Sequence, residues 1–260
     1  MAAFAHAKLG RLLLVELVVA GLVASTVVWF LACLWFPTIR KAIQQLPTQG
    51  AIRNQRLDLP SSVAQTLAET RPFLIVVLDL EKQRNASQTS DVLVEFHRKN
   101  YAICSLLGCV RLDYPKWWTI DFNRPKLEPW WEAWQPIFLG LSALVVIVLL
   151  LLSWAFLALI WCGLVRLLGF FKDRDLNWRS SWRVASASLL PGALLLTAGI
   201  WGYGLGVVDL IRLLLLFVIH FFVGGAYAVI SSFFVPRLSS VPTPGLNPFV
   251  VSESEPTQDA

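Results

Sequence analysis

The chain has 260 residues, of which 56% are apolar and only 15% are charged, whereas about 25% of the residues in an ordinary soluble domain are charged. The formal net charge of +5 is small and spread along the chain, which argues against nucleic acid as a partner and favours anionic lipid headgroups. Charges are sparse in four long apolar blocks and dense between Pro37 and Pro136. The composition therefore predicts a membrane-embedded part and one water-soluble insert.

The first apolar block predicts a transmembrane helix. Residues 1–11 are short and basic, and residues 12–36 are apolar except for Glu16. A cleaved signal peptide is the alternative, but the run is too long for its apolar region and no A-x-A cleavage site follows. A lipoprotein cleavage box at Cys33 fits poorly because Phe and Leu precede it. We expect residues 1–36 to form a cytoplasmic N-terminus and an uncleaved first span.

Residues 37–132 form the expected soluble domain. Apolar side chains at Ile39, Ala42, Ile43 and Leu46 recur with the period of a helix, which predicts a short amphipathic helix ended by Pro47. Four runs rich in apolar and β-branched residues then predict strands, with the fourth pairing with the third: residues 73–79, 91–96, 101–104 and 109–114. We expect a small β-rich domain of four to six strands. His97 lies in a polar loop and is expected on the solvated surface.

The four cysteines fit neither a disulfide framework nor a zinc site. Cys33 and Cys162 lie in apolar blocks and are expected to be inert packing residues. Cys104 and Cys109 flank the sequence Ser-Leu-Leu-Gly, which is consistent with a hairpin tip. Two interpretations remain open there: a disulfide formed in an oxidising compartment, and two free thiols on a β-turn.

The second span begins where tryptophans at positions 130, 131 and 134 mark re-entry into the membrane. Residues 133–165 contain no charge. As a helix, this stretch would be roughly 50 Å long at ~1.5 Å per residue, beyond a ~30 Å hydrocarbon core. We therefore expect the second span to tilt or to protrude from the bilayer.

A short basic loop sets the expected orientation. Residues 168–183 carry four basic side chains against two acidic ones, and a loop this short obeys the positive-inside rule. The loop is therefore expected in the cytoplasm, as is the basic N-terminus two spans earlier. The insert at residues 37–132 is then extracytoplasmic.

The third span is expected at residues 184–201. Pro191 removes a backbone donor and its ring clashes with a carbonyl one turn earlier, so we expect a kink near Ala187. Trp and Arg pairs precede this span at i, i+4 spacing. They place aromatic rings and guanidinium groups at the cytoplasmic interface.

The fourth span is expected at residues 207–235, with Asp209 and Arg212 forming a local ion pair near its outer end. Residues 133–238 would then complete a bundle of four transmembrane helices. The remaining segment, residues 239–260, is rich in Pro, Ser and acidic residues and is expected to be a disordered cytoplasmic tail. The predicted fold is mainly α, with a small extracytoplasmic β-rich domain inserted between the first two helices.

This order of parts resembles an uncharacterised bacterial integral-membrane family, some members of which are labelled maltodextrin utilisation proteins. The resemblance is carried by residues 39–47, by Phe73–Asp79 and most of all by the stretch Asn177–Pro191. The last helices also resemble the membrane domain of the Yip1 family. The resemblance implies a bacterial inner-membrane location. It carries no catalytic residues and no cofactor, because no catalytic signature defines the family.

Two ionisable residues within the spans are candidate functional groups. Glu16 lies about one turn inside the first span, within reach of solvent, Arg11 or Arg166. It has either a structural role or a role in coupling an ion or substrate. His220 lies near the middle of the fourth span. We expect it to hydrogen-bond a neighbouring helix, at Ser186, Ser188 or Thr197, with a proton or metal role as the alternative.

No catalytic motif, metal-ligand spacing or cofactor fingerprint is present in the sequence. The favoured function is a non-enzymatic scaffold, accessory or sensor of the bacterial cell envelope, with membrane lipids and other envelope proteins as partners. A small homo-oligomeric transporter or channel subunit is the alternative, because Pro191 interrupts the third span near Glu16, Arg166 and His220. An enzyme acting on lipid is the third hypothesis, for which the sequence offers no nucleophile and base pair.

Overall fold

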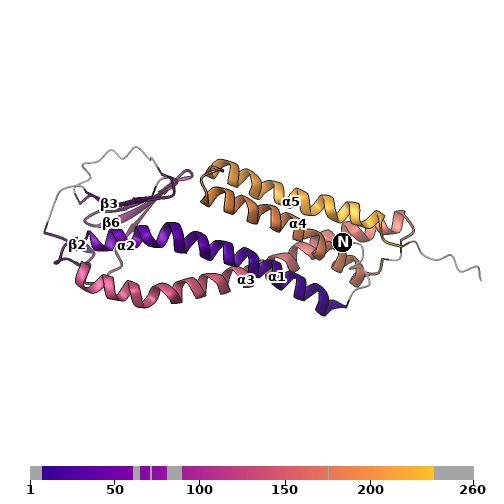
Figure 1. Ribbon diagram of the computed structural model, residues 1–260, viewed down its shortest axis with the longest axis horizontal. Helices are drawn as coiled ribbons and strands as arrows, with labels where there is room; N and C mark the ends of the chain where they lie inside the picture. The colour runs from indigo at the N-terminus through magenta and orange to yellow at the C-terminus, as the bar shows by residue number, and fades with distance from the viewer. Residues whose placement is uncertain (1–7, 61–64, 71, 81–89, 175, 237–260) are drawn as a thin grey trace, which may run out of the picture.

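The computed structural model describes residues 8–60, 65–70, 72–80, 90–174 and 176–236. Within them, four helical rods are long and apolar enough to span a membrane, and a β-sheet region lies between the first and the second rod (Figure 1). The predicted mainly helical fold with a small inserted β-rich domain is confirmed at this level. The expected disordered tail at residues 239–260 lies outside the described residues.

The first rod is longer than predicted. Helix α1 (Leu9–Phe30) continues through a wide turn at Leu31–Trp35 into α2 (Phe36–Gln44), so the short amphipathic helix is a continuation of the span rather than a separate element. The wide turn contains an i→i+5 hydrogen bond from the amide of Phe36 to Leu31. Pro37 has no amide to bond the carbonyl one turn earlier, and such a turn accommodates the loss.

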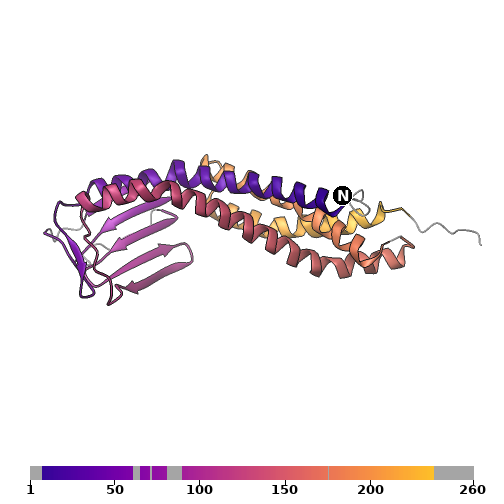
Figure 2. The ribbon, with the colours of Figure 1, turned by 90° about the horizontal axis from the view of Figure 1, so that it is seen from below.

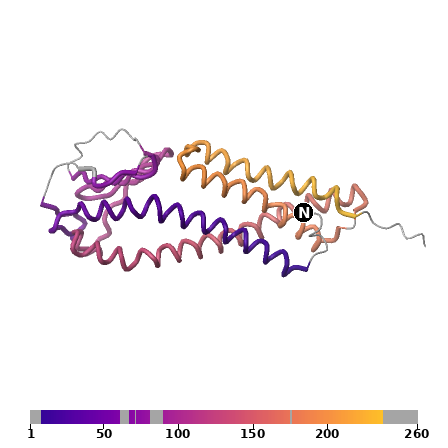
Figure 3. The backbone as a smooth tube through the Cα atoms, viewed as in Figure 1, coloured from indigo at the N-terminus to yellow at the C-terminus, as the bar shows by residue number. Residues whose placement is uncertain are grey.

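The second rod, α3 (Arg124–Phe171), has 48 residues and begins nine residues before the predicted span. Asn123 caps it by accepting a hydrogen bond from the amide of Lys126 at 3.2 Å. At ~1.5 Å per residue the helix is roughly 72 Å long, more than twice a ~30 Å hydrocarbon core. The prediction that this helix is too long for the bilayer core is confirmed, and Figure 3 shows its first part running beside α2 and beyond the other two helices.

The sheet has five strands in the order β3-β4-β5-β6-β7, with β4 and β5 parallel and the other neighbours antiparallel. The strands are β3 (Gln65–Thr70), β4 (Leu74–Leu78), β5 (Val92–Phe96), β6 (Asn100–Ser105) and β7 (Gly108–Asp113). All four predicted strands are present, and β7 pairs with β6 as predicted.

The expected count of four to six strands is wrong, because the described residues form seven. A separate hairpin, β1 (Ala51–Arg53) and β2 (Arg56–Asp58), precedes the sheet. Its turn at Asn54 and Gln55 has positive φ at both positions, as a two-residue hairpin turn requires. Strands of three residues, and a β3 that contains Gln, Thr and Glu, lack the apolar alternation by which strands are recognised.

One face of the sheet packs against α2. Ala42 and Leu46 join the buried sheet residues Leu67, Leu74 and Val76 in one hydrophobic cluster. The opposite face has its own cluster, which includes Ile75, Leu93 and Cys104. The helical periodicity of residues 39–46 therefore identified the helix face that contacts the sheet.

The remaining helices are α4 (Trp178–Gly204) and α5 (Leu210–Phe233), which pack side by side. The polar loop between α3 and α4 is shorter than the predicted residues 168–183, because α3 continues to Phe171 and Asn177 caps α4. Helix α4 continues through Pro191 without interruption, and the kink near Ala187 stays a prediction. Asp209 caps α5 and pairs with Arg212 at 3.5 Å, as predicted.

The bundle has two distinct ends. The start of α1, the α3–α4 loop and the end of α5 lie together at the right-hand end in Figure 1, and the sheet lies at the other end. The side chain of Arg174 ties the loop to the end of α5 by donating a hydrogen bond to the carbonyl of Val235 at 2.6 Å. Figure 2 shows the same arrangement from a second direction.

Candidate functional site: an apolar groove beside the sheet

A groove of about 440 Å³ lies between one face of the sheet and the protruding parts of the two long rods. This volume is within the ~300–1,000 Å³ typical of small-molecule sites. All its lining side chains are aliphatic or aromatic, and their only polar atoms are the indole nitrogens of three tryptophans. We call this feature the apolar groove, and its lining comes from three parts of the chain: Ile39, Ile43 and Leu46 from α2 and the turn after it, Val76, Val92, Val94 and Ile103 from the sheet, and Leu127, Trp130 and Trp131 from α3.

Alternation along the strands forms the floor of the groove. Successive side chains of a strand point to opposite faces of the sheet. Val92 and Val94 of β5 and Ile103 of β6 therefore line the groove, whereas Leu93 and Cys104 belong to the cluster on the opposite face. The floor is deeply buried near β4 and half-exposed at Ile103. The groove is therefore open on the side of β6 and β7.

The start of α3, which is rich in tryptophan, forms one wall of the groove. Trp131 is only 8% exposed and packs edge-on against Phe36, with ring centroids 5.1 Å apart. The indole N–H groups of Trp35 and Trp131 have no hydrogen-bond partner among the described residues. Tryptophans at positions 130, 131 and 134 were predicted as an interfacial belt, and the structure places the first two on the wall of the apolar groove.

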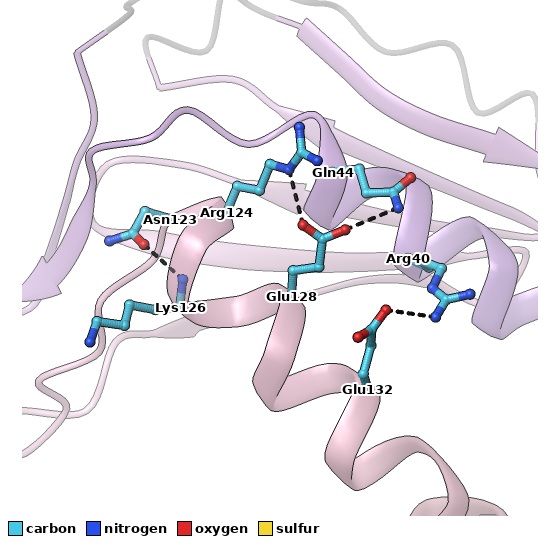
Figure 4. Close-up of polar contacts among 7 residues, drawn as sticks. All are labelled: Arg40, Gln44, Asn123, Arg124, Lys126, Glu128 and Glu132. Atoms are coloured by element: carbon cyan, nitrogen blue, oxygen red, sulfur yellow. Dashed lines mark hydrogen bonds and ion pairs between the residues drawn. The ribbon is translucent and has the colours of Figure 1, made fainter.

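A polar seam joins α2 to α3 beside the groove (Figure 4). Arg40 donates to Glu132 at 2.8 Å, and Gln44 donates to Glu128 at 3.1 Å. Arg124 donates to the second oxygen of Glu128 at 3.0 Å. The Arg40–Glu132 pair is about half-exposed, so it contributes little stability on its own. The seam sets the register between the two helices that form the groove walls.

Glu16 is buried in the helical bundle, with 4% of its surface exposed. The hydroxyl of Ser186 on α4 donates a hydrogen bond to Glu16 Oε1. The expectation that Glu16 reaches solvent or an arginine is wrong, because α1 turns this side chain toward α4. Ser186 is the partner that sequence reasoning did not assign, and its Ser/Ala-rich surroundings were the available signal.

Among the described residues, His220 makes no hydrogen bond to a neighbouring helix, contrary to the prediction. Its Nδ1 contacts the carbonyl of Phe217 on its own helix. The candidate partners bond elsewhere: Ser186 bonds Glu16, Ser188 bonds the carbonyl of Ala185, and Thr197 bonds the carbonyl of Ala193. In the part of the chain that the structure describes, no hydrogen bond or ion pair links His220 to Glu16.

The other candidates in the membrane also lie apart from the groove. Arg166 places its guanidinium over the ring of Trp178, 5.4 Å from the centroid. Pro191 is half-buried within α4. Among the residues that the structure describes, no group of three or more His, Cys, Asp or Glu side chains is placed to hold a metal ion.

The cysteine pair forms a disulfide. Cys104 and Cys109 face each other across β6 and β7 and are bonded, whereas Cys33 and Cys162 are free. The first of the two interpretations is therefore the one that the structure contains. The bridge lies on the face of the sheet opposite the apolar groove, so it braces the β6–β7 hairpin without entering the groove.

The expectation that His97 lies on the solvated surface is wrong. His97 is 7% exposed, and its Nδ1 lies 2.7 Å from the carbonyl of Asp79. Its own carbonyl accepts a hydrogen bond from the hydroxyl of Tyr114 at 2.9 Å. Burial, with a smaller effect of Tyr101, raises the pKa of the Tyr114 hydroxyl well above its ordinary value. The polar loop is thus folded back onto the sheet by its own side chains.

Comparison of the chain with protein-family models, with curated proteins and with solved structures finds no match. The apolar groove therefore has to be interpreted from its own geometry. No single stretch of sequence contains it, because its walls come from segments about ninety residues apart. The signals that were available were the apolar face of residues 39–46 and the tryptophans near position 130.

Proposed function

We propose that this chain is a non-enzymatic protein of the bacterial cytoplasmic membrane that binds an apolar ligand in the apolar groove. It would act as an accessory protein or sensor of the cell envelope, with lipids or other envelope proteins as partners and with self-association possible through its exposed apolar helix surfaces. The observation that carries the proposal is the groove itself. It is a wholly apolar site at the junction of a folded domain and two apolar helices.

The charge distribution supports a topology with both termini in the cytoplasm. The start of α1, the α3–α4 loop and the helix turns beside that loop lie at the end of the bundle away from the sheet. These segments carry seven basic residues: Lys8, Arg11, Arg166, Lys172, Arg174, Arg179 and Arg183. Short basic segments stay on the cytoplasmic side of a membrane. The sheet domain and its groove would then lie at the outer surface, in the compartment where a disulfide such as Cys104–Cys109 persists. The family resemblance noted above is consistent with this topology and remains part of the proposal.

The groove is tested with a fluorescent label at its open side. We would attach bimane to Ile103→Cys, after Cys33→Ser and Cys162→Ala remove the free thiols, and add a brominated alkane as a contact quencher. The matched control is Arg111→Cys. Arg111 pairs with Ala102, the neighbour of Ile103, so it lies one residue farther from the β6–β7 turn and on the other face of the sheet.

We expect the alkane to quench the label at position 103 severalfold more strongly than the label at position 111. The chain would be held in a nanodisc of unbrominated lipid for this measurement. Equal quenching at the two positions would remove the groove as a binding site.

A second candidate function is a small oligomeric transporter, and the buried Glu16 favours it. An intramembrane carboxylate is costly and is often part of an ion or substrate path. The test is flux through reconstituted protein: a transporter of this kind requires Glu16→Ala to reduce flux, with His220→Ala as the second variant. Flux unchanged by both substitutions would leave Glu16 with the structural role that its bond to Ser186 already provides.

A further inference from the structure

The turn between β6 and β7 lies at the end of the sheet that faces the membrane helices. Asp91, at the start of β5, accepts a hydrogen bond from Tyr203 at the end of α4. Val92 pairs with Ser105, and Ser105 pairs with Gly108. The two residues between Ser105 and Gly108 are therefore at the same end as Tyr203. Figure 2 shows this hairpin directed toward the helices.

Those two residues are leucines, and both are exposed. Leu106 is 51% exposed and Leu107 is 89% exposed. Hairpin turns ordinarily use Gly, Asn or Asp, which tolerate positive φ and satisfy the backbone. Here the positive φ falls on Gly108 instead. Two leucines at the tip of a turn are unfavourable in water, but they suit a tip that enters the interface of a bilayer.

Exposed apolar side chains lie between this tip and the groove. Ile103 and Val110 are a cross-strand pair on β6 and β7, and both are exposed. Ile103 also lines the apolar groove. Between this pair and the turn, the same face carries Gly108 and Ser105, whose hydroxyl accepts a hydrogen bond from the amide of Leu107. An apolar ligand that moves from the membrane-facing end of the hairpin to the groove floor therefore passes one small hydroxyl and otherwise apolar side chains.

We propose that the apolar groove holds one acyl chain of a membrane phospholipid, which enters from the adjacent leaflet past the Leu106–Leu107 turn. This inference rests on the proposed function of the groove and names its ligand class. The headgroup stays at the bilayer surface, and the chain lies along the strip formed by Ile103 and Val110 before reaching the groove.

The chemistry of the lining favours a hydrocarbon chain over a protein segment. A peptide strand has backbone donors and acceptors that must be satisfied when buried, and the groove lining offers it only indole N–H groups. An acyl chain has no such requirement. The supply also matches, because the open side of the groove lies along β6 and β7, and the turn between these strands is at the end of the sheet that contacts the membrane helices.

The experiment uses the same labelled proteins in nanodiscs made from a phospholipid brominated in the middle of its acyl chain. We expect severalfold stronger quenching of bimane at Ile103→Cys than at Arg111→Cys. The two positions differ in height by one residue, about 3.4 Å along the strand, so direct quenching by the bilayer surface affects both to a similar extent. Adding Leu106→Ser and Leu107→Ser is expected to lower quenching at position 103 severalfold. The control is Trp117→Ser, which removes an exposed aromatic side chain beyond the opposite end of β7 and is expected to change nothing.

The possible outcomes distinguish the binding function of the groove from the identity of its ligand. Quenching by the brominated alkane without quenching by the brominated phospholipid would leave the binding function standing and overturn the acyl chain as its ligand. Quenching by neither would overturn both proposals. A photo-crosslinker at position 103 that captures a second copy of the chain instead of lipid would assign the groove to self-association and also overturn the inference.

Discussion

The hydroxyl of Tyr203, at the end of α4, donates a hydrogen bond to Asp91 Oδ2 at 2.7 Å, at the start of β5. The ring of Tyr203 also packs against Phe73 and Phe30, with centroids 5.0 Å and 5.5 Å away. The contacts with Asp91 and Phe73 join α4 to the sheet domain, in addition to the connection that the two long rods make. They fix which end of the sheet faces the membrane, and therefore where the groove opens.

Replacing Tyr203 by Phe should weaken this junction. The change keeps the ring contacts and removes one bond to a carboxylate, which is worth about 1.5–3 kcal/mol when well formed. We expect the free energy of unfolding to fall by about 1–2 kcal/mol because the site is only partly buried. Thermal unfolding of the full chain in detergent measures this.

The control for that prediction is Tyr227→Phe on α5, whose hydroxyl makes no hydrogen bond to the described residues and is exposed. It is expected to leave the unfolding temperature unchanged. A double-mutant cycle with Asp91→Asn isolates the pair. A coupling energy of zero would show that the two side chains act independently.

Ser186→Ala should destabilise the bundle, because it leaves the Glu16 carboxyl buried without its hydrogen-bond donor. Hydrogen bonds between membrane helices contribute about 0.6 kcal/mol on average, and a buried group left unpaired costs about 1–3 kcal/mol. We expect a loss of about 1 kcal/mol in detergent unfolding. The matched control is Ser188→Ala, two residues along the same helix, where the hydroxyl bonds the carbonyl of Ala185 within the helix. Equal losses for the two variants would contradict a specific role of Ser186.

Gly192 lies at a close approach of α4 to α5. A Cβ at this position would lie 2.5 Å from the carbonyl oxygen of His220, so Gly192→Ala must push the two helices apart. Overpacking of this kind costs about 1–3 kcal/mol. Gly163→Ala, at a position with no atom within 4 Å of the new methyl group, should instead stabilise α3 by up to about 1 kcal/mol. Opposite shifts of the unfolding temperature for the two variants are the expected result.

The Cys104–Cys109 bridge should stabilise the sheet domain modestly. It closes a short loop, with a separation of five residues, for which the chain-entropy model gives about 2 kcal/mol. We expect Cys104→Ser with Cys109→Ser to lower the stability of the sheet by that amount. Non-reducing mass spectrometry of the unmodified chain should find both thiols oxidised.

The bridge also reports the topology. In intact cells, a thiol reagent should label Cys104 and Cys109 only after reduction or when the oxidising system of the envelope is absent. Labelling of both cysteines without reduction would place the sheet domain in a reducing compartment and contradict the proposed orientation.

Several features of the fold were accessible from the sequence because they depend on local patterns. Apolar runs predicted the four rods, the strands at residues 73–79 and 109–114 followed from their residue types, and the period of residues 39–46 predicted the helix face that packs on the sheet. The strands β1, β2 and β3 were missed, since short or polar strands are specified by their partners rather than by their own alternation.

The contacts of the candidate residues were less accessible from the sequence, because packing between distant segments decides them. Glu16 and Ser186 are 170 positions apart and meet only because α1 and α4 pack together. The sequence predicted His97 to be a surface residue, but the loop between β5 and β6 places its ring against the carbonyl of Asp79. Neither contact has a sequence period that would reveal it.

The stretch Asn177–Gly206 shows how far each source of information reaches. The sequence by itself determined that this stretch contains an apolar helix with a proline in its middle, preceded by a basic and aromatic segment, because hydropathy and charge act over a few residues. The structure added that the helix begins earlier than predicted, with Asn177 as its cap. Only the tertiary structure decided that Ser186 faces Glu16, that Gly192 meets the backbone of His220 and that Tyr203 holds the sheet. These contacts depend on how rods of unequal length are placed beside one another. That placement also forms the apolar groove, because the side chains that line it come from segments distant in the chain.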